Sequence, residues 1–242
     1  MILQTSIAVS TAESRPILTG IHMVIANNQL KAVATDSHRL SQRIIPLEMP
    51  ETSNALTFEI TLPGKTLIEL SRIIDGLETI DFAITENQVL FQTETLSFYS
   101  RLLEGRYPDT DRLINDQFNT AITVIASDLV AAVDRASLMS HTDKNNIATL
   151  SINENRILLT GNSPEIGKVE EEITVENYEG ASLDVSFNPD YLKDALRLFG
   201  SSEATIQFLE ANRPFTLTLK DNHSDIPYSF IQLVTPVRTF NG

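Results

Sequence analysis

Along the first half of the chain, hydrophobic and polar residues mostly alternate from one position to the next, which favours β-strands. Only two stretches have the spacing of an α-helix. Gln29–Thr35 is a clear strand pattern, and Asn27-Asn28 before it is a strong hairpin signal. Pro63 and Gly64 open the one full helical pattern, which Asp75-Gly76 ends. The predicted strands are Ile17–Ala26, Gln29–Thr35, Arg39–Leu47, Leu56–Leu62, Thr79–Thr85, Gln88–Thr93 and Leu96–Leu103. The predicted helices are Gly64–Ile74 and Met1–Ser10, the latter as the back half of a helix. We predict a loop at Pro50–Ala55 and a polar linker at Glu104–Asn115.

The second half of the chain shows the same order of patterns. Ser127 or Asp128 is a plausible N-cap for a helix that reaches about Ser140, and Asn188-Pro189 opens a second helix that runs to about Phe199. Glu154-Asn155 is the predicted turn of a hairpin. The predicted strands are Ile122–Ala126, Thr149–Ile152, Arg156–Thr160, Glu170–Val175, Leu183–Phe187, Thr205–Leu209, Phe215–Leu219 and Ser229–Val234.

The two halves also resemble each other in their residues. Phe58–Ile74 aligns with Asp184–Phe199, with a proline at the mouth of each helix, and Asn27–Ser37 aligns with Glu154–Ser163. A duplicated unit explains this better than chance. We therefore expect an α+β fold with two domains, residues 1–116 and 117–242. The first copy lacks the opening strand and half of the first helix that the second has, so we expect the chain to begin inside a domain, with a sheet edge uncovered.

Composition and charge narrow the class of protein. The 242 residues include no cysteine, which excludes disulfides, thiolate metal sites and a cysteine nucleophile and fits a cytoplasmic location. The four histidines are scattered, without metal-ligand spacing. No apolar run is long enough for a membrane span, and the start has no signal-peptide pattern. The net charge is −14 and neither half is basic, so any contact with DNA must be confined to one face.

One heptapeptide interrupts the apolar pattern in a distinctive way. In Ala34-Thr35-Asp36-Ser37-His38-Arg39-Leu40, four polar residues follow a strand before an apolar residue returns. Asp36 and Ser37 suit a turn, because their side chains can bond their own backbone. Arg39 beside Leu40 leaves the turn with a long cation next to a large apolar group. The residues alone leave open a plain turn or a binding surface.

The heptapeptide resembles a segment in the middle domain of bacterial sliding clamps, the beta subunit of DNA polymerase III. Further matches in the same order cover the chain nearly end to end: Ser14–Gly20, Gly105–Asp109, Ser163–Gly167 with the acidic run Glu170–Ile173, Phe187–Tyr191 and Gln232–Arg238. The chain resembles the second and third domains of this family, of the Gram-positive type found in lactic-acid bacteria and streptococci. The resemblance implies two DNA-clamp domains with antiparallel sheets outside and paired helices on the inner face.

The resemblance also implies a function. Clamps close as head-to-tail dimers into rings that encircle duplex DNA without sequence preference and tether the replicative polymerase for processive synthesis. They are not catalytic themselves, and no cofactor is implied. A groove between the two domains takes short apolar or aromatic peptides from the polymerase, the clamp loader, ligase and repair polymerases. The matching positions are Leu18, Thr35, Ser37, His38, Arg39, Leu40, Pro108, Arg112, Leu113, Asn188, Tyr191, Leu233, Val234, Thr235, Pro236, Val237 and Arg238.

The chemistry of these positions suits a peptide groove, which needs an apolar floor and a few polar groups at its rim. Leu18, Leu40, Leu233, Val234 and Pro236 could supply the floor. Arg39, Arg112 and Arg238 could bind peptide carbonyls or an acidic residue, and Tyr191 offers a ring and a hydroxyl. Many clamps have glycine at the position of Ser37 and methionine at those of Thr235 and Val237, so the depth of the groove and its peptide preference are open.

The cations on the predicted inner helices are candidates for contact with phosphate, which a protein that slides on DNA needs without base readout. The candidates on these helices are Lys65, Arg72, Arg135, Lys193 and Arg197; Lys144, just beyond one of the helices, and Arg15, in the loop before Pro16, are further candidates. The alternative is that they belong to solvated helix faces. Two other functions compete with an encircling clamp. One is an enzyme, for which Asp36 with His38, or the run of Glu170, Glu171 and Glu172, lacks the spacing of a known motif. The other is a peptide-binding module that does not encircle DNA.

Overall fold

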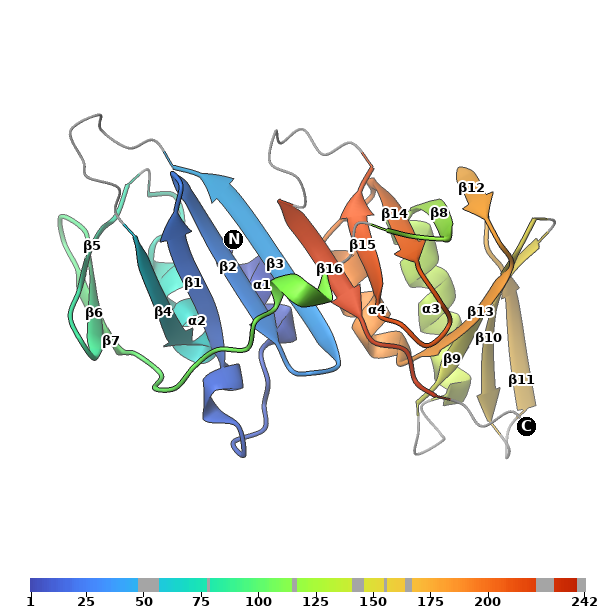
Figure 1. Ribbon diagram of the computed structural model, residues 1–242, viewed down its shortest axis with the longest axis horizontal. Coiled ribbons are helices and arrows are strands. Elements are labelled where there is room, and N and C mark those ends of the chain that lie inside the picture. Colours follow the sequence, from blue (N-terminus) through green and yellow to red (C-terminus); the bar gives the residue numbers. More distant parts are fainter. Residues whose placement is uncertain are drawn as a thin grey trace. The chain divides into compact units, whose positions relative to one another are not determined.

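The structure is a computed structural model of the chain, shown in Figure 1. It describes residues 1–47, 57–77, 79–114, 117–140, 146–154, 156–163, 167–220 and 229–238. The predicted loop Pro50–Ala55 lies outside these residues. The described residues form two compact units: one holds those of Met1–Thr110 with Ser229, and the other those of Asp111–Asp225 and from Phe230 onward. No helix among the described residues is long and apolar enough to cross a membrane.

The first unit contains an antiparallel sheet of four strands and a smaller antiparallel sheet of three. The strands of the larger sheet pair in the order β3-β2-β1-β4, and those of the smaller in the order β5-β6-β7. Its elements are α1 (Ile2–Thr5), η1 (Ser6–Ala8), η2 (Pro16–Thr19), β1 (Gly20–Ala26), β2 (Gln29–Thr35), β3 (Arg39–Pro46), β4 (Phe58–Pro63), α2 (Gly64–Ile73), β5 (Asp81–Ile84), β6 (Gln88–Gln92) and β7 (Ser97–Arg101).

The second unit contains two antiparallel sheets, paired in the orders β12-β8-β14-β15-β16 and β11-β10-β9-β13. Helix α3 packs against α4 and against strands of both sheets (Figure 1). The elements are η3 (Asp111–Leu113), β8 (Thr120–Ile125), α3 (Ala126–Ser140), β9 (Ala148–Asn153), β10 (Arg156–Ser163), β11 (Gly167–Glu172), β12 (Asn177–Gly180), β13 (Leu183–Phe187), α4 (Pro189–Arg197), β14 (Glu203–Phe208), β15 (Phe215–Leu219) and β16 (Phe230–Val234).

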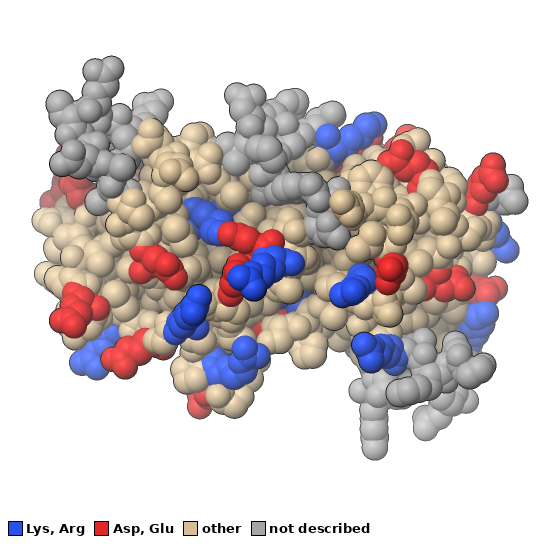
Figure 2. All heavy atoms as spheres, viewed as in Figure 1, with Lys and Arg blue, Asp and Glu red and all other residues tan. Residues whose placement is uncertain are grey.

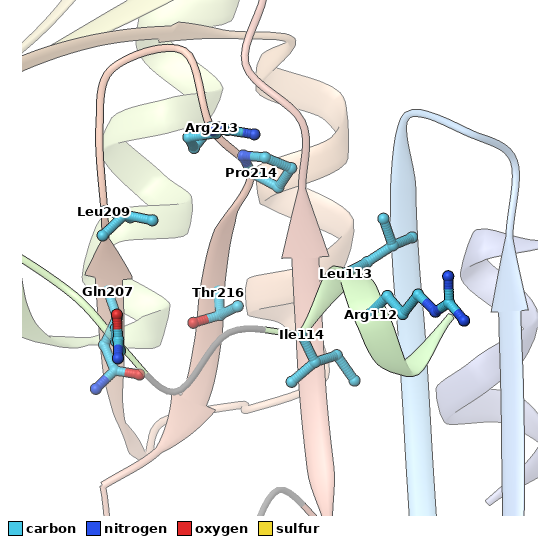
Figure 3. A pocket seen from close by; sticks show the side chains of 9 residues that line it. Arg112, Leu113, Ile114, Gln207, Leu209, Arg213, Pro214 and Thr216 are labelled. Atoms are coloured by element: carbon cyan, nitrogen blue, oxygen red, sulfur yellow. The ribbon is translucent and has the colours of Figure 1, made fainter. Parts of the chain in front are cut away.

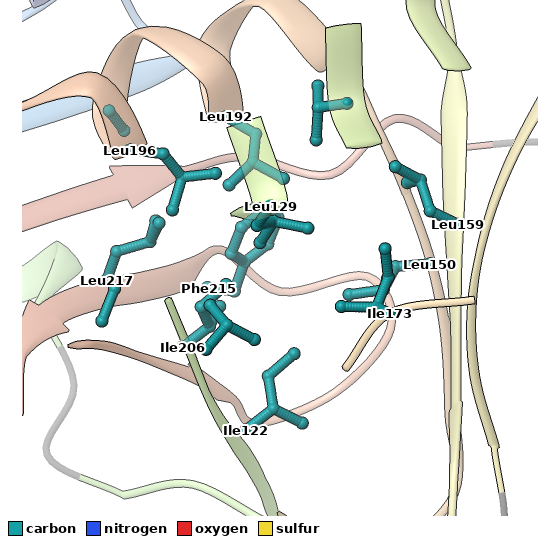
Figure 4. Close-up of a cluster of buried hydrophobic side chains, with 14 of the residues drawn as sticks. Ile122, Leu129, Leu150, Leu159, Ile173, Leu192, Leu196, Ile206, Phe215 and Leu217 are labelled. Carbon is teal, nitrogen blue, oxygen red and sulfur yellow. The ribbon is translucent and has the colours of Figure 1, made fainter. Parts of the chain in front are cut away.

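Each unit has its own hydrophobic core. The core of the second unit joins α3 and α4 to the inner faces of both its sheets, with Leu129, Leu192 and Phe215 almost fully buried (Figure 4). The core of the first unit is smaller and includes Leu62, Leu67 and Leu70. These antiparallel sheets with few helices confirm the predicted α+β class.

The repeated sequence patterns fold into the same elements in both units. Phe58–Ile74 forms β4 and α2, and Asp184–Phe199 covers most of β13 and all of α4. The aligned residues Leu67 and Leu192 are each 1% exposed. Asn27 and Asn28 have φ of 53° and 58°, as a two-residue hairpin with positive φ at both central positions requires.

Two of the predicted elements begin at other residues than expected, and one strand was not predicted. Ile17–Thr19 is a 3₁₀ turn rather than strand, since Pro16 sets a helical φ and the strand begins at Gly20. Helix α3 begins at Ala126, before the predicted cap at Ser127 or Asp128, and follows β8 directly. The backbone N–H of Ala126 donates to the carbonyl of Ser202 at 3.1 Å, so this first N–H has a partner without a side-chain cap. The strand β12 was missed.

The first predicted helix is shorter than expected. Residues Met1–Ser10 form one α-helical turn, Ile2–Thr5, followed by the 3₁₀ turn Ser6–Ala8. Thr5 and Ala8 are buried, and the Oγ1 of Thr5 donates to the carbonyl of Ile2 at 3.1 Å. The segment therefore packs on the first unit through two small residues rather than through a full helical face.

Candidate functional site

The heptapeptide Ala34–Leu40 forms the connection between β2 and β3, where Thr35 pairs with Leu40. The Oδ1 of Asp36 accepts from the backbone N–H of His38 at 2.9 Å and of Arg39 at 3.0 Å, while its Oδ2 accepts from the Nε of Arg39 at 3.0 Å. Ser37 has φ of 80°, in the left-handed region that favours glycine. The turn is therefore fixed by its own polar side chains, with Ser37 and His38 exposed.

Thr35 links this turn to the rest of the first unit. Its Oγ1 donates to the carbonyl of Arg39 at 2.7 Å and accepts from the N–H of Ser37 at 3.1 Å. Its own N–H donates to the hydroxyl of Tyr107 at 3.0 Å. From the other side, the Nη1 of Arg15 donates to the Oγ of Ser37 at 2.9 Å. Sequence reasoning placed Tyr107 within a family motif but gave it no role.

The residues predicted to form the apolar floor of the groove differ in how much of their side chain is exposed. Leu18 and Leu40 are 2% and 1% exposed, and Leu233 and Val234, which end β16, are 3% and 1% exposed. These four side chains can support a surface from below but present almost no area of their own. Contact with a ligand would fall on the half-buried or exposed apolar residues, which are Pro108, Leu113, Tyr191, Pro236 and Val237.

In the second unit, Asn188 is the N-cap of α4. Its Oδ1 accepts from the N–H of Asp190 at 2.9 Å and from the Nδ2 of Asn146 at 3.3 Å. Tyr191, in the first turn of this helix, packs against the core while remaining partly exposed. Both residues therefore have a structural role that is compatible with, and separate from, the predicted binding role.

The tail that follows β16 is held against the smaller sheet of the second unit. The N–H of Val237 donates to the carbonyl of Ser186, in β13, at 2.7 Å. Pro236, Val237 and the exposed Arg238 form one side of a hollow of about 920 Å³. The hydroxyl-bearing face of the sheet forms its floor, through Thr149, Ser151, Thr160 and Ser186.

Thr235, directly after β16, is half-buried. Two more predicted groove residues of the second unit, Arg112 and Leu113, line a hollow of about 470 Å³ with residues that sequence reasoning missed (Figure 3). Arg213 and Pro214 lie in the connection between β14 and β15, and Thr216 lies on β15. The full lining is Arg112, Leu113, Ile114, Gln117, Gln207, Leu209, Arg213, Pro214 and Thr216. No sequence motif singled out the connection between β14 and β15, although the described residues that line the hollow include two arginines and no acidic residue.

Most of the cations predicted to face DNA are paired with acidic side chains. Arg72 binds Glu69 at 2.7 Å in the same helix, and the guanidinium of Arg135 binds both carboxylate oxygens of Glu171 at 2.7 and 2.8 Å. Hydrogen bonding between that pair raises the pKa of Arg135 and lowers the pKa of Glu171. On the face in Figure 2, basic and acidic side chains are likewise interspersed.

Lys193 is the most enclosed of these cations, with 13% of its side chain exposed. Burial lowers its pKa, but hydrogen bonds to Asp190 and Asp134, with N–O distances of 3.1 and 3.2 Å, outweigh burial, so that its pKa is raised. Arg197 also approaches Asp134, at 3.8 Å. Lys65 is exposed and has no ion pair within the described part of the chain, and Lys144 lies outside it.

Comparison with known proteins accounts for both units. Residues 1–109 match the family described as "DNA polymerase III beta subunit, central domain", and residues 111–232 match "DNA polymerase III beta subunit, C-terminal domain". Proteins named "Beta sliding clamp" from Streptococcus pneumoniae and Bacillus subtilis are 46% and 42% identical to the chain over 99% of its length. One from Lactococcus lactis is 43% identical over 98%.

Solved structures agree with these matches. The DNA polymerase III beta chain of Streptococcus pneumoniae has a TM-score of 0.91 with 46% identity, covering 98% of this chain. The DNA polymerase sliding clamp of Bacillus subtilis has a TM-score of 0.90 with 42% identity, covering 99%. The chain spans about 62% of the length of these relatives. On this evidence, the chain belongs to the DNA polymerase III beta subunit, or beta sliding clamp, family and matches the family's central and C-terminal domains.

Proposed function

We propose that this chain acts as a sliding clamp, a non-catalytic processivity subunit that encircles duplex DNA and tethers the replicative polymerase. Its partners would dock short peptides in a groove to which both units contribute residues. The observation that carries the proposal is the family match across both units, together with the heptapeptide, which the structure shows as a turn fixed by its own side chains. The clamp loader, ligase and repair polymerases are partners on the same proposal.

The surface chemistry of the two units supports peptide docking. In the first unit, the turn presents the exposed His38 two positions before the buried Leu40. In the second unit, the tail presents half-buried Pro236 and Val237 beside the exposed guanidinium of Arg238. A peptide with a large apolar side chain and a polar backbone would find both an apolar contact and donors for its carbonyls here.

Self-association of the chain into a ring has its own physical support in the second unit. β11 is an edge strand of its sheet, so one side of its backbone is available for pairing with another chain. On helix α3, which packs against β11, the large apolar side chain of Leu138 is 65% exposed and would add apolar area to such a contact. We assign this edge to the head-to-tail contact that a clamp ring requires.

The test of the proposal is the binding of a fluorescent clamp-binding pentapeptide, followed by polarisation. We expect saturable binding that Arg238→Ala weakens and that removal of residues 235–242 abolishes. The truncation should follow Val234, because Val234 belongs to the core and an earlier end would unfold the unit. Arg156→Ala, which removes an exposed arginine paired with Glu172, is the matched control and should bind as the wild type does. No binding by the intact chain would refute the proposal.

A peptide-binding module that does not encircle DNA is the alternative, because the turn and the tail lie within this chain whatever closes a ring. Whether the protein stays bound to circular DNA distinguishes the encircling clamp from the peptide-binding module. An encircling clamp loaded on a nicked circular plasmid stays bound after transfer to high salt and is lost when the plasmid is linearised. A module that only docks peptides is lost from both forms.

A further inference from the structure

Tyr107 has an unusual position for a residue in a linker, because its side chain is buried and its hydroxyl serves a strand. It is 5% exposed, and its hydroxyl accepts the N–H of Thr35 at 3.0 Å. The pairing of β1 with β2 starts at His22–Val33 and so does not reach Thr35. Tyr107 therefore supplies the acceptor that the neighbouring strand does not supply, for a backbone N–H whose residue is only 6% exposed.

The ring of Tyr107 is itself held firmly. It stacks on the imidazole of His22 with ring centroids 4.6 Å apart and an angle of 3° between the planes. His22 is fixed in turn by Thr61, whose Oγ1 lies 3.0 Å from its Nδ1, and by Glu59, whose Oε1 lies 3.4 Å from its Nε2. Strands β1 and β4 thus determine where the hydroxyl of Tyr107 lies.

The approach of the linker depends on Gly105, which has φ of 112°. A residue with a side chain would be strained in this conformation, so glycine two positions before Tyr107 lets the chain turn and direct the ring inward. This gives a physical reason for two residues of the segment Gly105–Asp109: one allows the turn and the other bonds Thr35.

Resting on the proposed function, we propose that Tyr107 is a positioning residue that holds the turn 35–40 in the conformation that binds a partner peptide. The connection runs from the Tyr107 hydroxyl to the N–H of Thr35, and from the Oγ1 of Thr35 to the carbonyl of Arg39 and the N–H of Ser37. At 5% exposure Tyr107 has almost no surface for a peptide, so its effect must pass through Thr35.

Loss of the hydroxyl has a definite kinetic signature. Without it, the N–H of Thr35 is buried without an acceptor, and conformations that release this N–H become populated at the expense of the binding conformation. If one tenth of the molecules keep the binding conformation, the apparent Kd rises tenfold. The association rate then falls, because fewer molecules can bind, while the dissociation rate of the bound peptide is unchanged.

The experiment compares Tyr107→Phe with Tyr178→Phe in the full chain, using the labelled pentapeptide and stopped-flow polarisation. Tyr178 is the matched control, since its hydroxyl donates to the carbonyl of Gly180 at 2.8 Å in the second unit, and it lines neither of the hollows that predicted groove residues line. We expect Tyr107→Phe to raise Kd about tenfold through the association rate, and Tyr178→Phe to bind as the wild type does. A merely structural role would leave Kd unchanged at temperatures where the variant is folded.

Hydrogen exchange of the Thr35 amide gives a second readout that does not depend on peptide binding. We expect this amide to be protected in the wild-type chain and to exchange faster in Tyr107→Phe, while the amide of Val33 is unaffected. Wild-type Kd in Tyr107→Phe, a change confined to the dissociation rate, or an unprotected Thr35 amide in the wild type would overturn the proposal. Failure of the wild-type chain to bind peptide would instead refute the proposed function, and the exchange measurement would still decide the role of the Tyr107 contact.

Discussion

Helices α2 and α4 arise from aligned segments of the two repeats, yet their polar side chains are held in different ways. Helix α4 is capped by Asn188, and its cations Lys193 and Arg197 reach Asp134 on α3. Within the described residues, helix α2 has no side-chain cap, and its Arg72 pairs with Glu69 in the same helix. Helix α4 is therefore held by ion pairs to α3. In α2 the ion pair lies within the helix, and Lys65 has no ion pair within the described part of the chain.

This difference teaches that a cation on an aligned helix face cannot be assigned to DNA from its position alone. Arg72 and Arg197 are aligned, yet Arg197 approaches Asp134 on α3, whereas Arg72 pairs with Glu69 in its own helix. An ion pair in place before DNA arrives must be broken or shared when a phosphate approaches, which lowers the gain from that contact. Lys65 is thus a better candidate for phosphate contact than Lys193.

The largest expected effect is on the free energy of unfolding, and it tests whether the aligned leucines of α2 and α4 are packed alike. Leu67 and Leu192 are each 1% exposed in their cores, so Leu67→Ala and Leu192→Ala should each lower the free energy of unfolding by about 2 to 5 kcal/mol. Leu3→Ala, at a site 60% exposed, is the control and should change it by less than about 0.5 kcal/mol. Urea denaturation measures all three, and a small effect of either core variant would show that the repeats do not pack alike.

The next effect concerns Tyr107 at high pH. Burial, and to a lesser degree the charge of Asp36, raise the pKa of Tyr107 to about 12. Since the folded pKa is above the usual value of about 10, this group stabilises the fold fully below pH 10, and the contribution is lost as pH rises through 12. The free energy of unfolding should fall by about 2 to 3 kcal/mol over this range, from two pKa units at 1.36 kcal/mol each. Tyr107→Phe should lack that part of the fall, and identical pH profiles would contradict the account.

A smaller effect separates the two helix starts. Asn188→Ala removes the side chain that accepts the N–H of Asp190 and should cost about 1 kcal/mol, measured by thermal unfolding. Asn188→Ser keeps a capping oxygen and should be close to the wild type. Equal losses in both variants would mean that Asn188 stabilises α4 through its other contact, with Asn146, rather than as a cap.

The smallest expected effect is on the salt dependence of DNA binding, and it compares Lys65 of α2 with Lys193 of α4. Lys65→Gln should lower the slope of log K against log salt concentration for duplex DNA by about 0.9, the value for one phosphate contact. Lys193→Gln should lower it less, because Asp134 and Asp190 already bind that ammonium. Equal slopes for Lys193→Gln and Lys65→Gln would show that ion pairs do not decide which lysine contacts DNA.

Local signals in the sequence were enough to predict most of the strands. Asn27-Asn28 specifies its hairpin because both residues tolerate positive φ, and the alternation in Gln29–Thr35 gives a strand with those bounds. Asn177–Gly180 was missed because the asparagine and glycine at its ends are rare in strands, and it forms a strand by pairing with β8. Residues Ile17–Thr19 have strand-like composition, and Pro16 with Gly20 decides otherwise.

The candidate site was less accessible to sequence reasoning. The heptapeptide and the tail stood out as motifs, but nothing in the sequence shows that Tyr107 bonds Thr35, 72 positions away. Nor does it show that Leu18 and Leu40 are almost fully buried while Pro108 stays partly exposed. Long-range hydrogen bonds and burial depend on tertiary packing, and a single sequence carries no signal for them.

The central claim, that one peptide uses residues of both units, is tested most directly by calorimetric titration of the chain with the pentapeptide. The account predicts one peptide per chain, with affinity lowered about 5-fold to 30-fold, or by 1 to 2 kcal/mol, by His38→Ala in the first unit and by Arg238→Ala in the second. Two peptides per chain, or a loss of affinity from only one of these variants, would contradict it.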